Sequence, residues 1–182
     1  MRNRGPRKPR PPLGAEKLEE LALAYVARFA TTRAKLAAYL KRKLSERGWD
    51  GAGEPPVEAI VGKAARAGYV DDAAFAISKA RALSGRGYGP RRLAQALQAA
   101  GVGEQDGEAA RDHASGEAAE AALRFARRRR IGPFARARPS PEAREKALAA
   151  MVRAGHDFRL AKAILAIEPG AEVDSQALEL PR

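Results

Sequence analysis

The sequence of 182 residues contains no cysteine and few large apolar side chains. The absence of cysteine excludes disulfides, thiolate zinc sites, iron–sulfur clusters and cysteine nucleophiles. Leu, Ile, Val and Phe together number 33, whereas alanine alone numbers 42. Because alanine has the highest helix propensity and lets helices approach closely, this composition predicts a helix-rich protein with a modest core.

Long hydrophobic runs are also missing from the sequence. No charge-free stretch approaches the roughly 20 apolar residues that a membrane-spanning helix needs. Residues 1–12 lack the apolar stretch of a signal peptide. We therefore expect a soluble, cytoplasmic protein that does not bind membranes.

Positive charge is concentrated in a few segments of a chain whose net charge is +12. Residues 1–12 and 124–138 are rich in basic side chains and contain no acid, and residues 33–47 and 79–92 are also strongly basic. Such clusters favour a polyanion or an acidic protein surface, whereas single basic residues are common on solvated helix faces. The consecutive arginines at 127–130 repel one another, which favours a negatively charged partner.

Apolar residues recur at intervals of three and four from residue 16 onward, and no segment shows the alternation typical of strands. The pattern runs through three rounds of three helices. It predicts an all-α fold, an elongated tandem array of three-helix repeats with about nine helices. The expected organisation is a flexible basic arm (1–15), three helical repeats (16–70, 71–114 and 115–167) and a flexible tail (168–182).

Residues that favour helix starts or helix ends border several of these stripes. The expected N-caps are Thr31 or Thr32, Asp71 or Asp72, Ser140 and Asp157. Pro90 is expected at the first position of its helix. Trp49 and Tyr88 lie beside helix ends, where we expect them to pack as apolar plugs, although aromatic rings can also stack on nucleic-acid bases.

No group of residues in the sequence predicts catalysis. His113 and His156 fall in different repeats, and neither has a carboxylate cluster at metal-ligand spacing beside it. The Gly-rich segment 84–90 follows no strand and lacks the closing Gly-Lys-Ser/Thr of a phosphate loop, so we expect an interhelical turn. We therefore expect no enzyme, no metal site and no cofactor; an enzyme would need a nucleophile or a metal cluster that the sequence does not show.

Three segments of the sequence form a recognisable set: TTRAKLAAYLKRKL at 31–44, AGYVDDAAFA at 67–76 and GYGPRRLAQAL at 87–97. In this order and spacing, they resemble the signature segments of the RecX family of regulatory proteins. The pattern Gly-Tyr-Val-Asp-Asp-x-x-Phe-Ala in the middle segment is the specific one, since basic helices alone occur in many proteins. The resemblance covers residues 20–103 well and 115–167 loosely.

The resemblance implies tandem three-helix repeats and a regulatory, non-enzymatic role. Members of this family bind the RecA recombinase filament along its helical groove. They suppress its ATP hydrolysis, strand exchange and coprotease activity, and thereby modulate recombination, DNA repair and the SOS response. Some also bind DNA. The expected partner is thus the RecA filament, with single- or double-stranded DNA as a further candidate, and we expect the protein to be a monomer.

Basic side chains opposite the apolar stripes are the candidates for the partner- or DNA-binding surface. They are Arg33, Lys35, Arg42, Arg86, Arg91, Arg92, Arg127, Arg128, Arg129 and Arg130. The family-motif residues expected to be structural are Gly68, Tyr69, Asp71, Asp72, Phe75 and Pro90. The alternative function is a non-specific nucleic-acid-binding helical module, whose affinity would fall steeply as salt rises.

Overall fold

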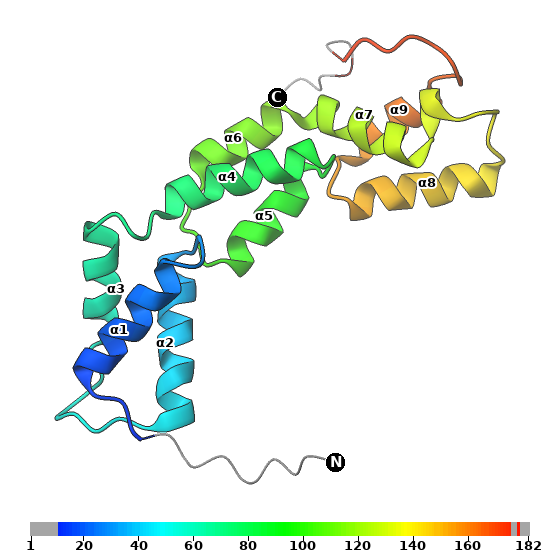
Figure 1. Cartoon of the computed structure of the whole chain (residues 1–182). Helices are drawn as coiled ribbons and strands as arrows, with labels where there is room; N and C mark the ends of the chain where they lie inside the picture. Colours follow the sequence, from blue (N-terminus) through cyan, green and yellow to red (C-terminus); the bar gives the residue numbers. More distant parts are fainter. Residues whose placement is uncertain (1–10, 176–177, 179–182) are drawn as a thin grey trace, which may run out of the picture. The chain divides into compact units, whose positions relative to one another are not determined.

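The computed structural model describes residues 11–175 and residue 178, and over these residues the chain is helical (Figure 1). Nine α-helices and one 3₁₀ turn, η1, lie in the described part, which contains no β-strand. Their bounds are α1 Ala15–Val26, α2 Arg33–Arg47, α3 Val57–Arg66, α4 Asp72–Gly85, α5 Pro90–Ala99, α6 Glu108–Gly116, α7 Ala118–Arg129, η1 Gly132–Phe134, α8 Pro141–Arg153 and α9 Phe158–Ala166. The all-α fold expected from the sequence is confirmed.

The chain divides into two compact units, one up to Asp72 and the other from Ala73. Helices α1–α3 lie in the first unit, and α4–α9 lie in the second, apart from Asp72 at the start of α4.

Local signals that the sequence carries start several of the helices. Thr32 caps α2, and its side chain accepts a hydrogen bond from the backbone nitrogen of Lys35 at 3.2 Å. Ser140 and Asp157 cap α8 and α9 in the same way. Pro90 is the first residue of α5. These helix starts are the ones expected from the sequence, because a cap or a first-position proline interacts only with residues close to it in the chain.

The first unit is built around large aliphatic side chains that lie on facing sides of α1, α2 and α3. Its buried residues include Leu18 on α1, Leu36 and Leu40 on α2, and Ile60 on α3. Leu13 is buried as well, and its backbone pairs with Gly48 and Asp50. Leu13 therefore does not belong to a flexible arm ending at residue 15; most of that expected arm, residues 1–10, lies outside the described residues.

The second unit contains two cores, and alanine contributes much of each. One core lies among α4, α5 and α6, with Leu93 and Leu97 as its large members. The other lies among α7, α8 and α9, around Met151 and Ile164. The third round of helices begins later than expected, since Ser115 still belongs to α6 and α7 starts at Ala118.

The segment after α9 makes apolar contacts that its composition did not suggest. Val173 and Leu178 pack against the α7–α9 core. The backbone nitrogen of Gly170 donates to the carbonyl oxygen of Pro133 at 2.8 Å. The part of the expected flexible tail at 176–177 and 179–182 lies outside the described residues.

Candidate functional site

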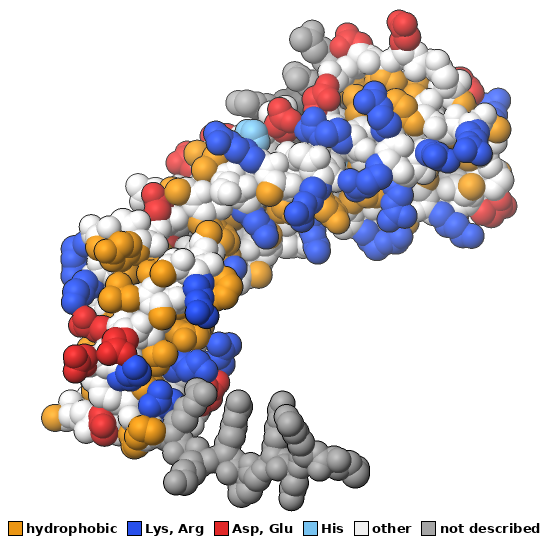
Figure 2. All heavy atoms as spheres, viewed as in Figure 1, with side chains coloured by type: hydrophobic (Ala, Val, Ile, Leu, Met, Phe, Trp, Pro, Cys, Tyr) orange, Lys and Arg blue, Asp and Glu red, His pale blue; other side chains and the backbone are white. Residues whose placement is uncertain are grey.

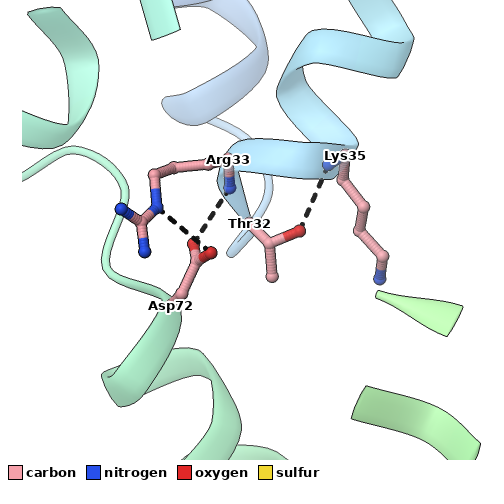
Figure 3. Close-up of polar contacts among 4 residues, drawn as sticks. All are labelled: Thr32, Arg33, Lys35 and Asp72. Carbon is pink, nitrogen blue, oxygen red and sulfur yellow. Dashed lines mark hydrogen bonds and ion pairs between the residues drawn. The ribbon is translucent and has the colours of Figure 1, made fainter. Parts of the chain in front are cut away.

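A buried carboxylate at the end of the first unit anchors the start of α2 (Figure 3). One oxygen of Asp72 accepts from the backbone nitrogen of Arg33 at 2.9 Å, and the other lies 3.2 Å from Nε of Arg33. The Asp72 side chain is only 3% exposed, whereas that of Arg33 is 50% exposed. Asp72, from the specific motif, therefore acts on a helix 39 positions earlier in the chain. Arg33, a candidate partner-binding residue, is held by this pair.

The rest of the motif shapes the turn between α3 and α4. Gly68 has a φ of 75°, a left-handed conformation that glycine adopts without strain. Val70 is buried in the core of the first unit, and Phe75 is half-buried. Tyr69 is 59% exposed, so this side chain is free to contact a partner rather than fixed in the core. Asp71 is exposed at the start of α4.

The basic side chains of α2 are mostly neutralised by acids of the same unit. Arg42 lies 3.7 Å from Glu46 and 5.6 Å from the ring centroid of Tyr39. Lys43 also pairs with Glu46, at 2.6 Å. Lys35 is exposed in the first turn of α2. The basic face expected here exists, but carboxylates are interleaved with it.

Half-exposed aromatic rings accompany this basic face. The rings of Tyr25 and Tyr39 stack with their centroids 4.3 Å apart. Phe29 lies 5.3 Å from Tyr25 and is 56% exposed. This cluster was not predicted, because Tyr25 and Phe29 follow the three- and four-residue spacing of apolar residues that also marks a helix core.

The arginine run at 127–130 does not form one surface. Arg128 and Arg129 face Phe125 on α7, with their guanidinium carbons 5.6 and 5.7 Å from its ring centroid. Arg127 lies over the ring of Phe134 instead, at 4.8 Å. Arg130 ends α7 in a left-handed conformation with φ of 54° and lines a different hollow. Successive residues of a helix point about 100° apart, so a run of four must be divided among faces.

Five arginines from separate segments of the second unit converge on one open pocket of about 610 Å³. Figure 2 shows basic side chains gathered over the part of the molecule that carries α5, α7 and α8. The pocket, called the arginine pocket below, is lined by Arg86, Tyr88, Arg92, Phe125, Arg128, Arg129, Ala150, Arg153 and Ala154. Among residues 11–175, no carboxylate lines it. Four of the ten predicted binding residues, Arg86, Arg92, Arg128 and Arg129, are thereby brought together.

Close backbone contacts between the α4–α5 and α8–α9 turns hold the walls of this pocket. The nitrogen of Gly89 donates to the oxygen of Ala154 at 3.0 Å, and the nitrogen of Arg91 donates to the oxygen of Gly155 at 3.2 Å. A Cβ atom on Gly89 would overlap the Gly155 carbonyl, and one on Gly155 would overlap the backbone of Arg92. We call these two glycines and their contacts the glycine joint.

A buried histidine supports the same joint. Nε2 of His156 lies 3.0 Å from the carbonyl oxygen of Gly87, and the imidazole ring meets Phe125 edge-on. Nδ1 is buried without a hydrogen-bond partner among the described residues. Burial lowers the pKa of His156, and the bond to Gly87 opposes this shift only in part. The imidazole is therefore neutral and structural.

The remaining sequence expectations fall outside the pocket or are purely structural. Arg91 lies 3.5 Å from Asp157, which compensates its charge. Trp49 is a plug, as expected, packed against the first core with Nε1 donating to the oxygen of Gly53 at 3.0 Å. Tyr88 packs against the α7–α9 core as a plug and also lines the arginine pocket.

Arg153 is a pocket residue that sequence reasoning missed. It lies in the last turn of α8, where a basic side chain is common because it complements the helix dipole. Only the fold shows that this turn closes against the start of α5.

Neither metal nor membrane features accompany these sites. Within residues 11–175, no three His, Asp or Glu side chains come together as metal ligands would. In the same part of the chain, every helix is too short or too polar to cross a bilayer.

Comparisons with known proteins agree with the motif in the middle of the chain. A family profile described as the second three-helix domain of RecX matches residues 71–110. The regulatory protein RecX of Myxococcus xanthus is 36% identical over 177 residues, which cover 92% of this chain and 94% of that protein. The regulatory protein RecX of Agrobacterium fabrum is 30% identical, with 75% of this chain and 74% of that protein covered.

The fold has solved counterparts as well. A crystal structure of RecX from Lactobacillus salivarius superposes with a TM-score of 0.60, covering 83% of this chain and 94% of that chain. Sequence identity in this superposition is 18%, so the similarity concerns the fold. The three-helix architecture inferred from the sequence is confirmed by this match and by the family profile.

Proposed function

Because the chain belongs to the RecX family of regulatory proteins, we propose that it binds the filament of the RecA recombinase and inhibits its ATP hydrolysis, strand exchange and coprotease activity. The observation that carries this proposal is the relationship to the Myxococcus xanthus protein, which extends over almost the whole of both chains. The chain is then a modulator of RecA and not an enzyme. Its effect would be on recombination, DNA repair and the SOS response.

The surface chemistry supports a partner that is negatively charged and partly apolar. The arginine pocket and the exposed aromatic side chains Phe29 and Tyr69 are the features that such a partner would use. Opposite charge mainly speeds encounter and sets orientation, whereas buried aromatic anchors carry most of the affinity. We expect the cations to guide the protein to the filament and the aromatic rings to hold it there.

The test is ATP turnover by RecA filaments on single-stranded DNA. Added protein should lower the turnover at sub-stoichiometric amounts, and an absence of inhibition at equimolar protein would refute the proposal. Phe29→Ala should raise the concentration needed for half-inhibition by about tenfold, because aromatic anchors dominate interface energies. Leu23→Ala is the matched control, since Leu23 is also on the first unit and is 51% exposed but carries no aromatic ring.

The alternative is a non-specific nucleic-acid-binding module that competes with the recombinase for DNA. The unpaired arginines of the second unit favour it, because phosphates are their usual partners. On this alternative, inhibition would follow binding to naked DNA and would vanish as salt rises, with a slope set by the number of phosphate contacts. Inhibition that persists at salt concentrations where naked DNA is released would favour direct binding to the filament.

A further inference from the structure

The arginine pocket has the charge and the rigidity of a specific anion site. We propose that it is a phosphate-binding site that holds a ligand with at least two phosphate groups. This inference does not rest on the proposed function, because it concerns the second unit alone and needs no recombinase. Two kinds of molecule carry such phosphate groups. One is a free polyphosphate, such as the phosphate chain of a nucleotide, and the other is a nucleic-acid strand with its consecutive phosphates.

The positive charge of the arginine pocket is not compensated by nearby acids. Arg86, Arg92 and Arg153 come from three segments, and Arg128 and Arg129 come from a fourth. Over the described residues, none of the five forms an ion pair with a carboxylate. Bringing like charges to one concave surface is unfavourable unless an anion joins them. The second unit pairs nearby cations readily, as Arg124 does with Glu117 at 2.7 Å, so the lack of acids is specific to the pocket.

The size and the side chains of the pocket suit a chain of phosphate groups. A guanidinium group donates two parallel hydrogen bonds to adjacent oxygens, and several such groups together match the many oxygens of a phosphate chain. The pocket volume of about 610 Å³ falls within the range of small-molecule sites. Its remaining surface consists of Tyr88, Phe125 and two alanines, whose side chains carry no negative charge that would compete with the ligand.

The backbone that carries the pocket arginines is held in place by contacts within the second unit. The glycine joint fixes the start of α5, and therefore Arg92, against the end of α8, which carries Arg153. Nη1 of Arg128 donates to the carbonyl oxygen of Arg86, which ties α7 to the α4–α5 turn. The Phe125 ring lies under both Arg128 and Arg129 and limits their movement. A ligand would meet a site whose backbone is already in place, which lowers the entropic cost of binding.

The experiment measures binding of inorganic triphosphate to the full-length protein by calorimetry. The test variant is Arg86→Gln/Arg153→Gln, which removes two pocket charges from exposed side chains. The control is Arg81→Gln/Lys146→Gln, which removes two charges from exposed positions on α4 and α8 that do not line the pocket. We expect the test variant to lose at least about tenfold in affinity and the control to lose less than about threefold.

Backbone amide shifts locate the binding independently of affinity. Triphosphate should shift the amide signals of Tyr88, Arg92 and Arg129, and leave those of α2 unchanged. Circular dichroism of both variants should match the unmodified protein. A triphosphate affinity that is equal in the test and control variants would overturn the proposal, as would amide shifts confined to other segments.

Two further ligands distinguish the sources of the phosphate. If a thymidine oligonucleotide also binds more weakly to the test variant than to the control, then strand phosphates use the pocket. If only triphosphate is affected, the pocket serves a free polyphosphate. A glutamate peptide of equal charge should bind at least about tenfold more weakly than triphosphate, because a carboxylate offers fewer oxygens and less charge per group. Equal binding of that peptide would refute a phosphate site and assign the pocket to an acidic protein.

Failure of this inference and failure of the proposed function give different results. If the protein inhibits RecA filaments but all variants bind triphosphate equally, the proposed function is supported and the phosphate site is refuted. If the protein binds triphosphate in the pocket but leaves ATP turnover by RecA unchanged, the phosphate site is supported and the proposed function is refuted.

Discussion

The two units of the molecule arrange their basic residues in different ways. In the first unit, Lys41 lies 3.0 Å from Glu58 and Lys63 lies 2.7 Å from Glu19, so exposed cations are interleaved with acids. In the second unit, the arginine pocket collects five guanidinium groups with no carboxylate among them. Exposed pairs add little stability, but they cancel the local potential. The position of the acids, more than the number of cations, therefore decides which basic surface can take an anionic ligand.

The units also differ in how they fix their helices. The first unit uses a side chain, since the Asp72 carboxylate binds the start of α2. The second unit uses the backbone, since Gly89 and Gly155 let two turns approach at the glycine joint. A side-chain tie can be removed while the backbone path is kept, whereas a joint between backbones cannot accept even one added methyl group.

The largest expected effect comes from Gly155→Ala. The new Cβ would overlap the backbone of Arg92, and the residue would keep a φ of 92° that alanine rarely adopts. We expect a loss of about 3 kcal/mol or more from the stability of the second unit and weaker triphosphate binding. Hydrogen exchange measured separately on peptides from each unit should show faster exchange in α5, α8 and α9, and unchanged exchange in α2 and α3.

Gly170→Ala is the matched control for this substitution. Gly170 also has a positive φ, 82°, but a Cβ there meets open space. Its cost should be only that of the backbone conformation, about 1 kcal/mol. If both substitutions destabilise the unit equally, the glycine joint is not a tight contact and the contrast between the units fails.

An intermediate effect is expected from Asp72→Ala in the first unit. The substitution removes both hydrogen bonds to Arg33 and leaves its backbone nitrogen without that acceptor. We expect a loss of about 1–3 kcal/mol, between the cost of a lost helix cap and that of breaking a buried pair, because Arg33 itself is half-exposed. Thermal unfolding and exchange of α2 peptides would measure it.

An exposed acid of the same unit provides the comparison for Asp72. Glu58→Ala removes the pair with Lys41, whose side chain is 63% exposed, and should cost less than about 1 kcal/mol. Triphosphate affinity should stay the same in both variants, since neither residue lines the arginine pocket. A cost for Asp72→Ala no larger than that for Glu58→Ala would contradict the anchoring role of the buried carboxylate.

The sequence predicted those parts of the fold and site that depend on near neighbours. Thr32, Ser140 and Asp157 cap helices as expected, because a cap interacts with backbone two or three residues away. The motif in the middle of the chain identified the family for the same reason, since its residues are contiguous. Four pocket arginines were also among the predicted binding residues, although their convergence was not predicted.

The features that sequence reasoning missed depend on distant contacts. Asp72 was expected to act near its own helix, and its partner Arg33 lies 39 positions away. Leu13 follows a Pro-rich segment, and only its pairing with Gly48 shows that it is buried. Arg153 belongs to the pocket because α8 ends beside α5, which no local pattern encodes.

The smallest expected effect is a pH dependence that only the second unit should show. Both histidines of the chain, His113 and His156, lie in that unit. His156 is fully buried beside the glycine joint, and burial lowers its pKa from the ordinary value of 6.5. Protonation would place a charge on a ring whose Nδ1 has no partner among the described residues.

The sign of the pH effect follows from this lowered pKa. Above pH 6.5 the imidazole is neutral in both the folded and unfolded chain, and the full stability of the unit is present. As the pH falls below 6.5, the unfolded chain takes up a proton that the folded chain refuses, so the free energy of unfolding decreases until the folded pKa is also passed. Unfolding in urea followed at several pH values should show this loss for the unmodified protein and for His113→Gln, and a reduced loss for His156→Gln. Hydrogen exchange in the first unit, which has no histidine, is the comparison. If that exchange accelerates as much as exchange in the second unit over the same pH range, His156 does not cause the pH dependence. The glycine joint is then no more sensitive to acid than the rest of the chain.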